Sequence, residues 1–456
     1  MASQRPGRRI GILGHVGTKN LGDEAIIAAV IQQIRDRYPD GQIVGFTHNP
    51  EDTQERHGIT SFPLRRNERE SGSAGATQPN KLSRLSTRIK AAAKAAPRLR
   101  AFLKGIQKGA RLVWGITAEL RFLMHCHGHL KDIDLLVVAG SNQLNDYFGG
   151  PWAFPYTLLK WCILARLVGA KVAFLCCGAG PLNSRLGKLF IKASLSLADY
   201  RSYRDEASRR LVESIGVCGH NPVSTDLACG LRLVQPAESE PTRSRLTVGI
   251  NPLPFCDERY WPVHNAEIYQ NYVGKLAAFA VWLNARGHRV VFFPTQLRAD
   301  PPVIQDIRGW LTSTGAANLE NPLVDRPMSS LDDLILRISM MDIVVATRYH
   351  GVLLSALLRR PVLAIAYLEK TRDFMTQIGQ GDYVVDINSF DTISLADRFV
   401  AVESRTKTIR REIEQRTQVL RQTLEGEYSC VFRLLEDVSG VGAADERVAA
   451  LARLHG

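Results

Sequence analysis

The chain has 456 residues, of which 45% are hydrophobic and 23% are charged. This composition excludes a disordered or fibrous chain and is typical of a globular protein, and the length predicts two domains. The formal net charge is +13, but no DNA-binding or RNA-binding motif accompanies it, so we expect no nucleic-acid partner.

The N-terminal segment MASQRPGRR leads directly into IGILG and lacks the apolar core and cleavage site of a signal peptide. The eight cysteines do not have the regular spacing of a disulfide framework. The most apolar stretch, 156–180, is interrupted by Lys160, Arg166 and Lys171, so no run approaches the roughly 18–20 apolar residues that span a bilayer. We therefore expect a cytoplasmic protein that does not cross a membrane.

The first fifty residues predict a strand (RRIGILG), a helix over 23–38 and a second strand (QIVGFTHNP). The loop GHVGTKNLGDEAI joins the first strand to the helix, where glycines permit close backbone approach and the helix N-terminus can bind an anion. It matches neither a dinucleotide fingerprint nor a phosphate-binding P-loop. Two interpretations stay open: the loop binds a ligand through Gly17, Asn20, Gly22 and Asp23, or its polar residues only cap the helix.

A basic helical insertion is predicted at about 65–128. Its segment 81–111 contains ten Lys and Arg residues and no Asp or Glu. Pro97 should break the helix, and apolar residues recur at helical spacing beyond it, at Leu99, Phe102, Leu103 and Ile106. The segment is either a solvated helical hairpin or a peripheral contact with an anionic membrane, at the inner face of that membrane.

The cluster HCHGH at 125–129 follows this insertion. Its imidazoles and thiol are zinc-ligand types, but they are too closely spaced for a zinc finger and no second half of a site is evident. We therefore expect a surface turn without a metal.

The next strand, IDLLVVAGS, is followed by the polar loop AGSNQLNDYFGG. Loops at the carboxyl ends of parallel strands form ligand sites, which makes Ser141 and Asn142 candidate binding residues. Asp146 is either a general base for a sugar hydroxyl or the cap of the following helix. A helix over 152–167 and the strand KVAFLCCGAGP come next.

Helices are predicted over 186–196 and 206–215, with SYRDEAS between them. Arg204 ends a short strand there and Asp205 begins a helix. The arginine is either part of a surface ion pair or a ligand for a carboxylate or phosphate, which its fork of donors matches. The Pro-, Ser-, Glu- and Thr-rich segment 235–245 is the best linker candidate and places a domain boundary near residue 240.

The second half repeats the alternation, with strands LTVGINPLP, HRVVFFPT, MDIVVATR and PVLAIAY and helices over 268–286, 331–339 and 351–358. The predicted fold class is α/β: two Rossmann-like, doubly wound parallel-sheet domains facing a cleft. The predicted units are 1–235, 243–400 and a C-terminal helical tail, 401–456, whose helix could pack back across the first domain.

The motif ATRYHG places Arg348 and His350 at a strand-to-helix turn. The turn combines a positive helix terminus, a permanently charged guanidinium and an imidazole that titrates near neutrality. An anionic donor that must be protonated requires these three features. Tyr367 and Lys370 follow the next strand, and Lys370 could add a cationic contact.

In their order and placement, NLGDEAI, the loop after LLVVAGS, RDEAS, STDLA, ATRYHG and PVLAIAYLEK resemble the polysaccharide pyruvyl transferase family. The resemblance implies a GT-B-like fold and transfer of an enolpyruvyl-derived group from phosphoenolpyruvate to a sugar, without a cofactor. It assigns donor binding and acid catalysis to Arg348 and His350, donor binding to Arg204, and the role of base to Asp146. The chain departs from the family where relatives carry a run of glycines, because Ser141 and Asn142 follow Gly140.

The resemblance implies that His350 protonates the methylene carbon of phosphoenolpyruvate while Asp146 deprotonates the acceptor hydroxyl. The acceptor would belong to a cell-surface polysaccharide or its lipid-linked precursor. Two alternatives remain: a glycosyltransferase that uses a nucleotide sugar, and a non-catalytic sugar-binding protein on the same scaffold.

Overall fold

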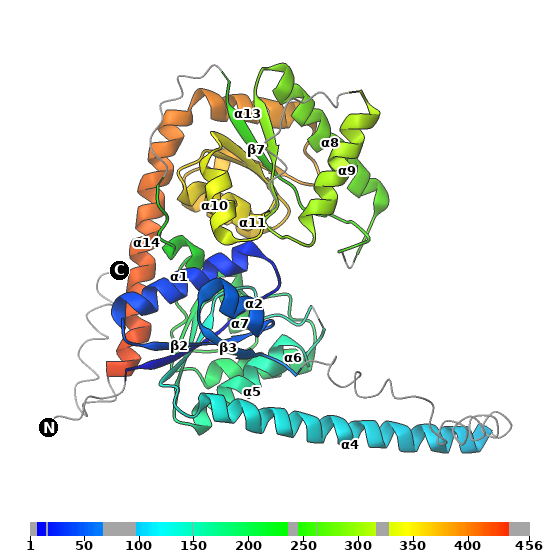
Figure 1. Ribbon diagram of the computed structural model, residues 1–456, viewed down its shortest axis with the longest axis vertical. Helices are drawn as coiled ribbons and strands as arrows, with labels where there is room; N and C mark the ends of the chain where they lie inside the picture. The colour runs from blue at the N-terminus through cyan, green and yellow to red at the C-terminus, as the bar shows by residue number, and fades with distance from the viewer. Residues whose placement is uncertain are drawn as a thin grey trace.

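The computed structural model describes residues 7–14, 17–66, 97–147, 149–235, 245–261, 263–315 and 328–436, without the side chains of 97–113. Strands and helices alternate along the chain, and two separate parallel sheets form, one in each half (Figure 1). The predicted α/β class is therefore confirmed. The predicted linker falls almost entirely on 236–244, which lies outside the described residues.

The first sheet has six parallel strands in the order β3-β2-β1-β4-β5-β6. Helices cover both of its faces, so central strands are continuous apolar runs; all five residues of LLVVA are buried. The strands are β1 (Arg9–Leu13), β2 (Gln42–Thr47), β3 (Thr60–Pro63), β4 (Leu135–Ala139), β5 (Lys171–Cys177) and β6 (Tyr200–Tyr203). The helices are α1 (Leu21–Arg37), α2 (Pro50–His57), α4 (Pro97–Leu130), α5 (Phe154–Leu167), α6 (Arg185–Ser196), α7 (Glu206–Ser214) and the 3₁₀ turn η1 (Leu227–Gly230).

The second sheet has five parallel strands in the order β11-β10-β9-β7-β8. The strands are β7 (Thr247–Asn251), β8 (Arg289–Phe292), β9 (Ile343–Ala346), β10 (Val362–Ala366) and β11 (Val384–Asp386). The helices are α8 (Ala266–Ala285), α9 (Asp300–Ser313), α10 (Leu331–Ser339), α11 (Tyr349–Leu357), α12 (Glu369–Gln377), the 3₁₀ turn η3 (Gly381–Tyr383) and α13 (Thr392–Ser404).

The C-terminal helix α14 (Thr406–Glu436) runs along one side of both domains (Figure 1). In the second domain, Arg359 forms an ion pair with Glu414 at 2.8 Å. In the first domain, the hydroxyl of Tyr200 donates to Glu427 at 2.7 Å. The predicted packing of this helix across the first domain is confirmed, and the helix joins the two halves.

A short backbone joint connects the domains beside helix α1. The amide of Leu21 donates to the carbonyl of Thr295 at 2.9 Å, and the amide of Leu297 donates to the carbonyl of Lys19 at 2.9 Å. Asn20 and Gln296 form an antiparallel bridge between these two bonds. The loop before α1 is therefore fixed against the loop that follows β8.

Helix α4 shows that one prediction from the sequence was wrong. A second prediction falls partly on residues that the structure does not describe. HCHGH is not a surface turn, because His125 and His129 lie in the last turns of this helix. Cys126 and Leu130 are buried at helical spacing and keep that end of the helix on the first domain. Pro97 is the first residue of α4, where its missing N–H costs nothing. The first arm of the expected hairpin, 81–96, lies outside the described residues.

Candidate active site

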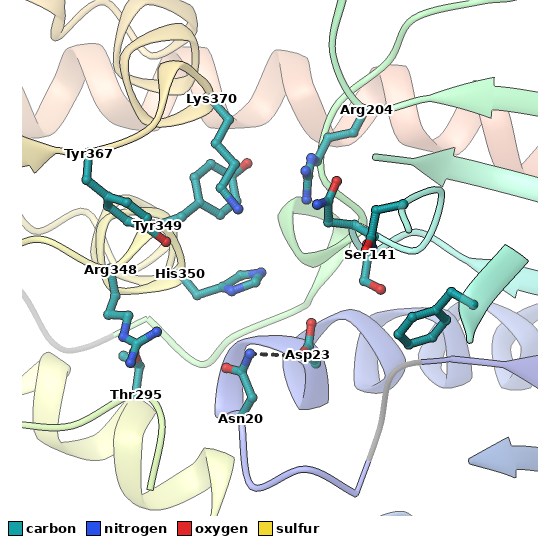
Figure 2. A pocket seen from close by; sticks show the side chains of 13 residues that line it. Asn20, Asp23, Ser141, Arg204, Thr295, Arg348, Tyr349, His350, Tyr367 and Lys370 are labelled. Carbon is teal, nitrogen blue, oxygen red and sulfur yellow. Dashed lines mark hydrogen bonds between the residues drawn. The ribbon is translucent and has the colours of Figure 1, made fainter. Parts of the chain in front are cut away.

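A cavity of about 190 Å³ lies between the two domains (Figure 2). Its walls come from both halves of the chain, and most lining residues lie just beyond the carboxyl end of a strand, as doubly wound sheets favour. The first half contributes Asn20, Asp23, Ser141, Asn142, Asn145, Phe154 and Arg204. The second half contributes Thr295, Arg348, Tyr349, His350, Tyr367 and Lys370. Most of the predicted site residues are therefore brought together in one place.

Arg348 stands at the N-cap position of helix α11, directly after β9. Its Nε donates to Oδ1 of Asp300 at 3.0 Å, and its Nη2 donates to the same oxygen. The other oxygen of the fully buried Asp300 accepts from the amides of Thr295 and Gln296 at 3.0 and 2.8 Å. One carboxylate therefore orients the guanidinium and also holds the loop of the domain joint.

Arg204 is buried at the cleft, so it is not part of a surface ion pair. Its Nη1 donates to Asp226 at 3.3 Å and its Nε donates to Asp205 at 3.4 Å. The guanidinium also lies 5.6 Å from the centre of the Tyr349 ring, within cation–π range. These contacts hold the charge at the junction of the two domains.

His350 is in the first turn of α11, and its Nε2 lies 3.9 Å from Oδ2 of Asp226. That nitrogen is buried and has no hydrogen-bond partner within the described residues. Burial lowers the pKa of His350 below its ordinary value, while the carboxylates of Asp226 and Asp23 oppose the shift. The imidazole is therefore neutral at rest near pH 7, and an anion bound beside it would favour its protonation.

Gly22 permits the close approach between helix α1 and His350. A Cβ at this position would lie 2.0 Å from Nδ1 and 2.2 Å from Cγ of His350. Asn20, the N-cap residue of α1, accepts from the amide of Gly22 at 3.2 Å and donates to Asp23 at 2.7 Å. The loop therefore caps the helix, as one interpretation of the sequence held, and it also lines the cavity.

We expect Gly22→Ala to displace His350 or separate the domains, because the added methyl group overlaps the ring. Overpacking of this kind costs about 1–3 kcal/mol of unfolding free energy. Denaturant unfolding and a turnover assay should both show a loss. The matched control is Gly309→Ala on helix α9, where a Cβ meets nothing within 4 Å. If Gly22→Ala is as stable and active as this control, the ring is not held as described.

Lys370 approaches the cavity from the start of helix α12. Its Nζ lies 4.8 Å from the centre of the Tyr349 ring, so two cations contact the same aromatic ring. Burial, followed by repulsion from Arg204, lowers the pKa of Lys370 to about 8. Lys370 has no ion-pair partner in the part of the chain that the structure describes. An incoming anion would therefore not compete with a carboxylate for this ammonium group, as it would at Arg204 and Arg348.

Three predicted site residues do not line the cavity: Asp146, Gly17, and Gly22, which packs against His350. The carboxylate of Asp146 accepts from the amides of Asn183 and Ser184 at 2.8 and 2.7 Å and from the Ser184 hydroxyl at 2.6 Å. Burial alone would raise the pKa of Asp146, but these hydrogen bonds lower it overall. Asp146 therefore holds the start of helix α6. Gly17 has φ +83° and donates its amide to Glu24 at 3.2 Å, away from the cavity.

Several residues of the site were missed in the sequence: Phe154, Asp226, Thr295, Asp300 and Tyr349. Asp226 is the most informative of them, because it contacts Arg204 and faces His350. STDLA contains this residue, but nothing local indicates that its carboxylate is buried. The signal in the sequence was that STDLA is one of the motifs that resemble the family.

The family model described as "Polysaccharide pyruvyl transferase" matches residues 20–369, which include every residue that lines the cavity except Lys370. No curated protein matches the chain in sequence.

Solved structures show the same overall fold at low sequence identity. A glycosyltransferase from Rickettsia africae has a TM-score of 0.53 and 9% identity, covering 95% of this chain and 100% of its own. An α,α-trehalose 6-phosphate synthase from Burkholderia multivorans has a TM-score of 0.51 and 12% identity, covering 96% and 100%. A UDP-GlcNAc 2-epimerase from Neisseria meningitidis has a TM-score of 0.50 and 13% identity, covering 92% and 100%. These similarities show the two-domain GT-B arrangement and nothing about substrates.

Proposed function

The chain belongs to the polysaccharide pyruvyl transferase family, and we propose that it transfers a pyruvyl group from phosphoenolpyruvate to a sugar of a cell-surface polysaccharide or its lipid-linked precursor. The observation that carries the proposal is the grouping of Arg204, Arg348, Lys370 and His350 around one small cavity. Phosphoenolpyruvate presents a carboxylate and a phosphate on three carbons, so it needs several cations within a short distance.

The size and charge of the cavity favour such a donor over a nucleotide sugar. At about 190 Å³ it is smaller than the roughly 300–1,000 Å³ that pockets for drug-sized ligands occupy. Arginine forks pair with carboxylates and phosphates through two donors, and the N-terminus of helix α11 adds partial positive charge. In this proposal Arg348, Arg204 and Lys370 hold the two anionic groups of the donor.

His350 would be the acid of the reaction. Donor binding places negative charge beside the imidazole and favours its protonated form, and the proton is then delivered to the methylene carbon of phosphoenolpyruvate. Attack by an acceptor hydroxyl forms a bond to the adjacent carbon. Protonation therefore converts the C=C π bond into a methyl C–H bond, and the proton of the first hydroxyl passes to the base as its oxygen bonds to carbon. A second hydroxyl of the same sugar then forms the other C–O bond as the C–O bond to phosphate breaks, and its proton leaves with inorganic phosphate. Positioning and acid–base catalysis account for each step, so we propose no cofactor and no metal.

Asp23 replaces Asp146 as our candidate base. Its carboxylate lines the cavity and accepts from Asn20 at 2.7 Å, whereas Asp146 is engaged at helix α6. Asp23 and His350 line the same cavity, and Gly22, the neighbour of Asp23, lies against the His350 ring. The neutral side chains of Ser141, Asn142 and Asn145 lie on the same domain and suit sugar hydroxyls.

Donor affinity should fall as the pH rises through about 8. The pKa of Lys370 in the free protein is about 8, below its ordinary value. The side chain is therefore charged below that pH and loses its charge above it, when it no longer attracts the donor. Titration calorimetry with phosphoenolpyruvate from roughly pH 6.5 to pH 9.5, a range on both sides of this pKa, should show the fall in donor affinity for the wild-type protein. Lys370→Arg should remove it because arginine keeps its charge, and an unchanged fall in that variant would assign the titration to another group.

The eight cysteines are all free thiols, which suits a reducing compartment, and we propose a cytoplasmic location. A glycosyltransferase that uses a nucleotide sugar is the alternative, because solved structures with this fold include a glycosyltransferase. A non-catalytic sugar-binding protein is the third candidate.

Titrating the purified protein with phosphoenolpyruvate and, separately, with uridine diphosphate distinguishes these functions. We expect binding of phosphoenolpyruvate and its loss in Arg348→Met. Binding of the nucleotide alone would favour the glycosyltransferase, and binding of neither would favour the non-catalytic protein.

A further inference from the structure

Helix α4 extends well beyond the body of the first domain. It has 34 residues, and Figure 1 shows most of its length projecting past helices α5 and α6. Its C-terminal part packs on the domain. There Cys126 and Leu130 are buried. The Nζ of Lys160 lies 4.6 Å from the centre of the Phe122 ring and forms an ion pair with Glu119 at 3.0 Å. These contacts define the inner face of the helix.

A different face of α4 carries exposed apolar side chains. Ile116, Leu120 and Met124 are 52%, 54% and 67% exposed and are spaced four residues apart, so they form one stripe. No other part of the described chain covers this stripe. The sequence continues the same helical spacing toward the N-terminus at Val113, Ile106, Phe102 and Leu99. The apolar periodicity therefore runs along almost the whole helix.

The charged residues of the segment 81–111 are all basic. Residues 81–111 contain ten Lys and Arg residues and no acidic residue. At helical spacing Arg100, Lys104, Lys108 and Arg111 fall on the side opposite the apolar stripe. The first acidic residue of α4, Glu119, is already engaged by Lys160 and by the hydroxyl of Tyr156. An anionic surface would therefore meet no opposing negative charge along the projecting half of the helix.

We propose that α4 lies along the surface of a bilayer that contains anionic lipids, with Ile116, Leu120 and Met124 inserted at its edge. A long helix with an apolar stripe and a basic face is the pattern of interfacial helices. Within the described ranges no helix is both long and apolar enough to cross a membrane, so contact through these ranges would be peripheral. Nucleic acid would use the basic residues but would leave the apolar stripe exposed. Docking does not depend on pyruvyl transfer; only the consequence that the site lies beside a lipid-linked sugar rests on the proposed function.

The test is co-sedimentation of the full-length protein with vesicles in the absence of donor and acceptor. We expect binding to vesicles of phosphatidylcholine with phosphatidylglycerol, weaker binding to phosphatidylcholine alone, and a decrease with salt. The triple variant Ile116→Ser, Leu120→Ser, Met124→Ser should lower the partition coefficient by about tenfold or more. The matched control, Ile393→Ser with Val419→Ser, changes side chains that are 74% and 57% exposed on α13 and α14 and should bind as wild type.

Three outcomes would overturn the proposal: no binding of wild type to anionic vesicles, equal binding of the triple variant, or equal loss in the control variant. Sedimentation velocity without vesicles measures whether the protein is a monomer or a dimer, and so tests whether a second copy of the chain covers the stripe instead. A wild-type dimer that the triple variant converts to a monomer, with no vesicle binding by either, would assign the stripe to a second copy of the chain. Phosphoenolpyruvate titration of the triple variant checks that its active site is folded, and a failure of donor binding in wild type would count against the proposed function alone.

Discussion

Replacing His350 with Gln lowers the turnover of pyruvyl transfer by about 10²–10⁴-fold, the range that a positioned general acid contributes. Glutamine keeps a polar side chain of similar reach but cannot deliver a proton to carbon. The fold should tolerate the change, because Nε2 of His350 has no hydrogen-bond partner within the described residues that would be lost. Phosphate release measured with phosphoenolpyruvate and a sugar acceptor gives the rate directly.

The matched control is His220→Gln, since His220 is exposed and lies outside the cavity. Its turnover should equal that of wild type. Phosphoenolpyruvate should still bind to His350→Gln, because Arg204, Arg348 and Lys370 remain. Full turnover in His350→Gln would mean that another group supplies the proton.

Replacing Arg348 with Met lowers both stability and donor affinity. The carboxylate of Asp300 is fully buried, and its Oδ1 accepts from Nε and Nη2 of Arg348. Removing one partner of a buried ion pair typically costs about 3–5 kcal/mol, because the other charge is left without compensation. Denaturant unfolding should therefore show a loss of this size, and titration should show no measurable donor binding.

A second variant separates these two effects. Arg348→Met combined with Asp300→Asn removes both charges and keeps an amide oxygen that can accept from Thr295 and Gln296. The double variant should regain most of the lost stability and should still fail to bind phosphoenolpyruvate. Recovery of donor binding in the double variant would show that Arg348 serves only to neutralise Asp300.

The fold and the position of the site could be predicted from local patterns. Continuous apolar runs such as IVVA and LLVVA indicate strands that are buried on both faces, and polar motifs directly after them indicate the carboxyl edges of the sheets. Arg348, His350 and Lys370 follow two such strands. Their convergence on one cavity depends only on the topology that parallel sheets require.

The carboxylates that complete the site could not be predicted, because their partners are distant in sequence. Asp300 lies 48 residues from Arg348 and precedes two prolines, which obscured helix α9. Asp226 lies 22 residues from Arg204. Asp146 and Asp23 are both acidic residues near a helix start, and only the tertiary contacts show that Asp146 holds α6 while Asp23 lines the cavity.

The expected turn at HCHGH has a similar explanation. The cluster lies shortly before the strand IDLLVVAGS and was expected to form a surface turn. The buried Cys126 and Leu130 continue the helical period of the preceding apolar residues, and packing of that face on the first domain decides the structure. The position before a strand favoured a turn at this cluster, whereas packing on the first domain favours a helix, and the helix is what forms.

The central claim is that the cavity around Arg348 and His350 transfers a pyruvyl group to a sugar. Mass spectrometry of the cell-surface polysaccharide tests it most directly, with wild-type cells compared with cells that carry His350→Gln at the same protein level. We predict pyruvate ketals on the polysaccharide of wild-type cells and their loss in the variant. Equal ketal content in the two polysaccharides would contradict the account.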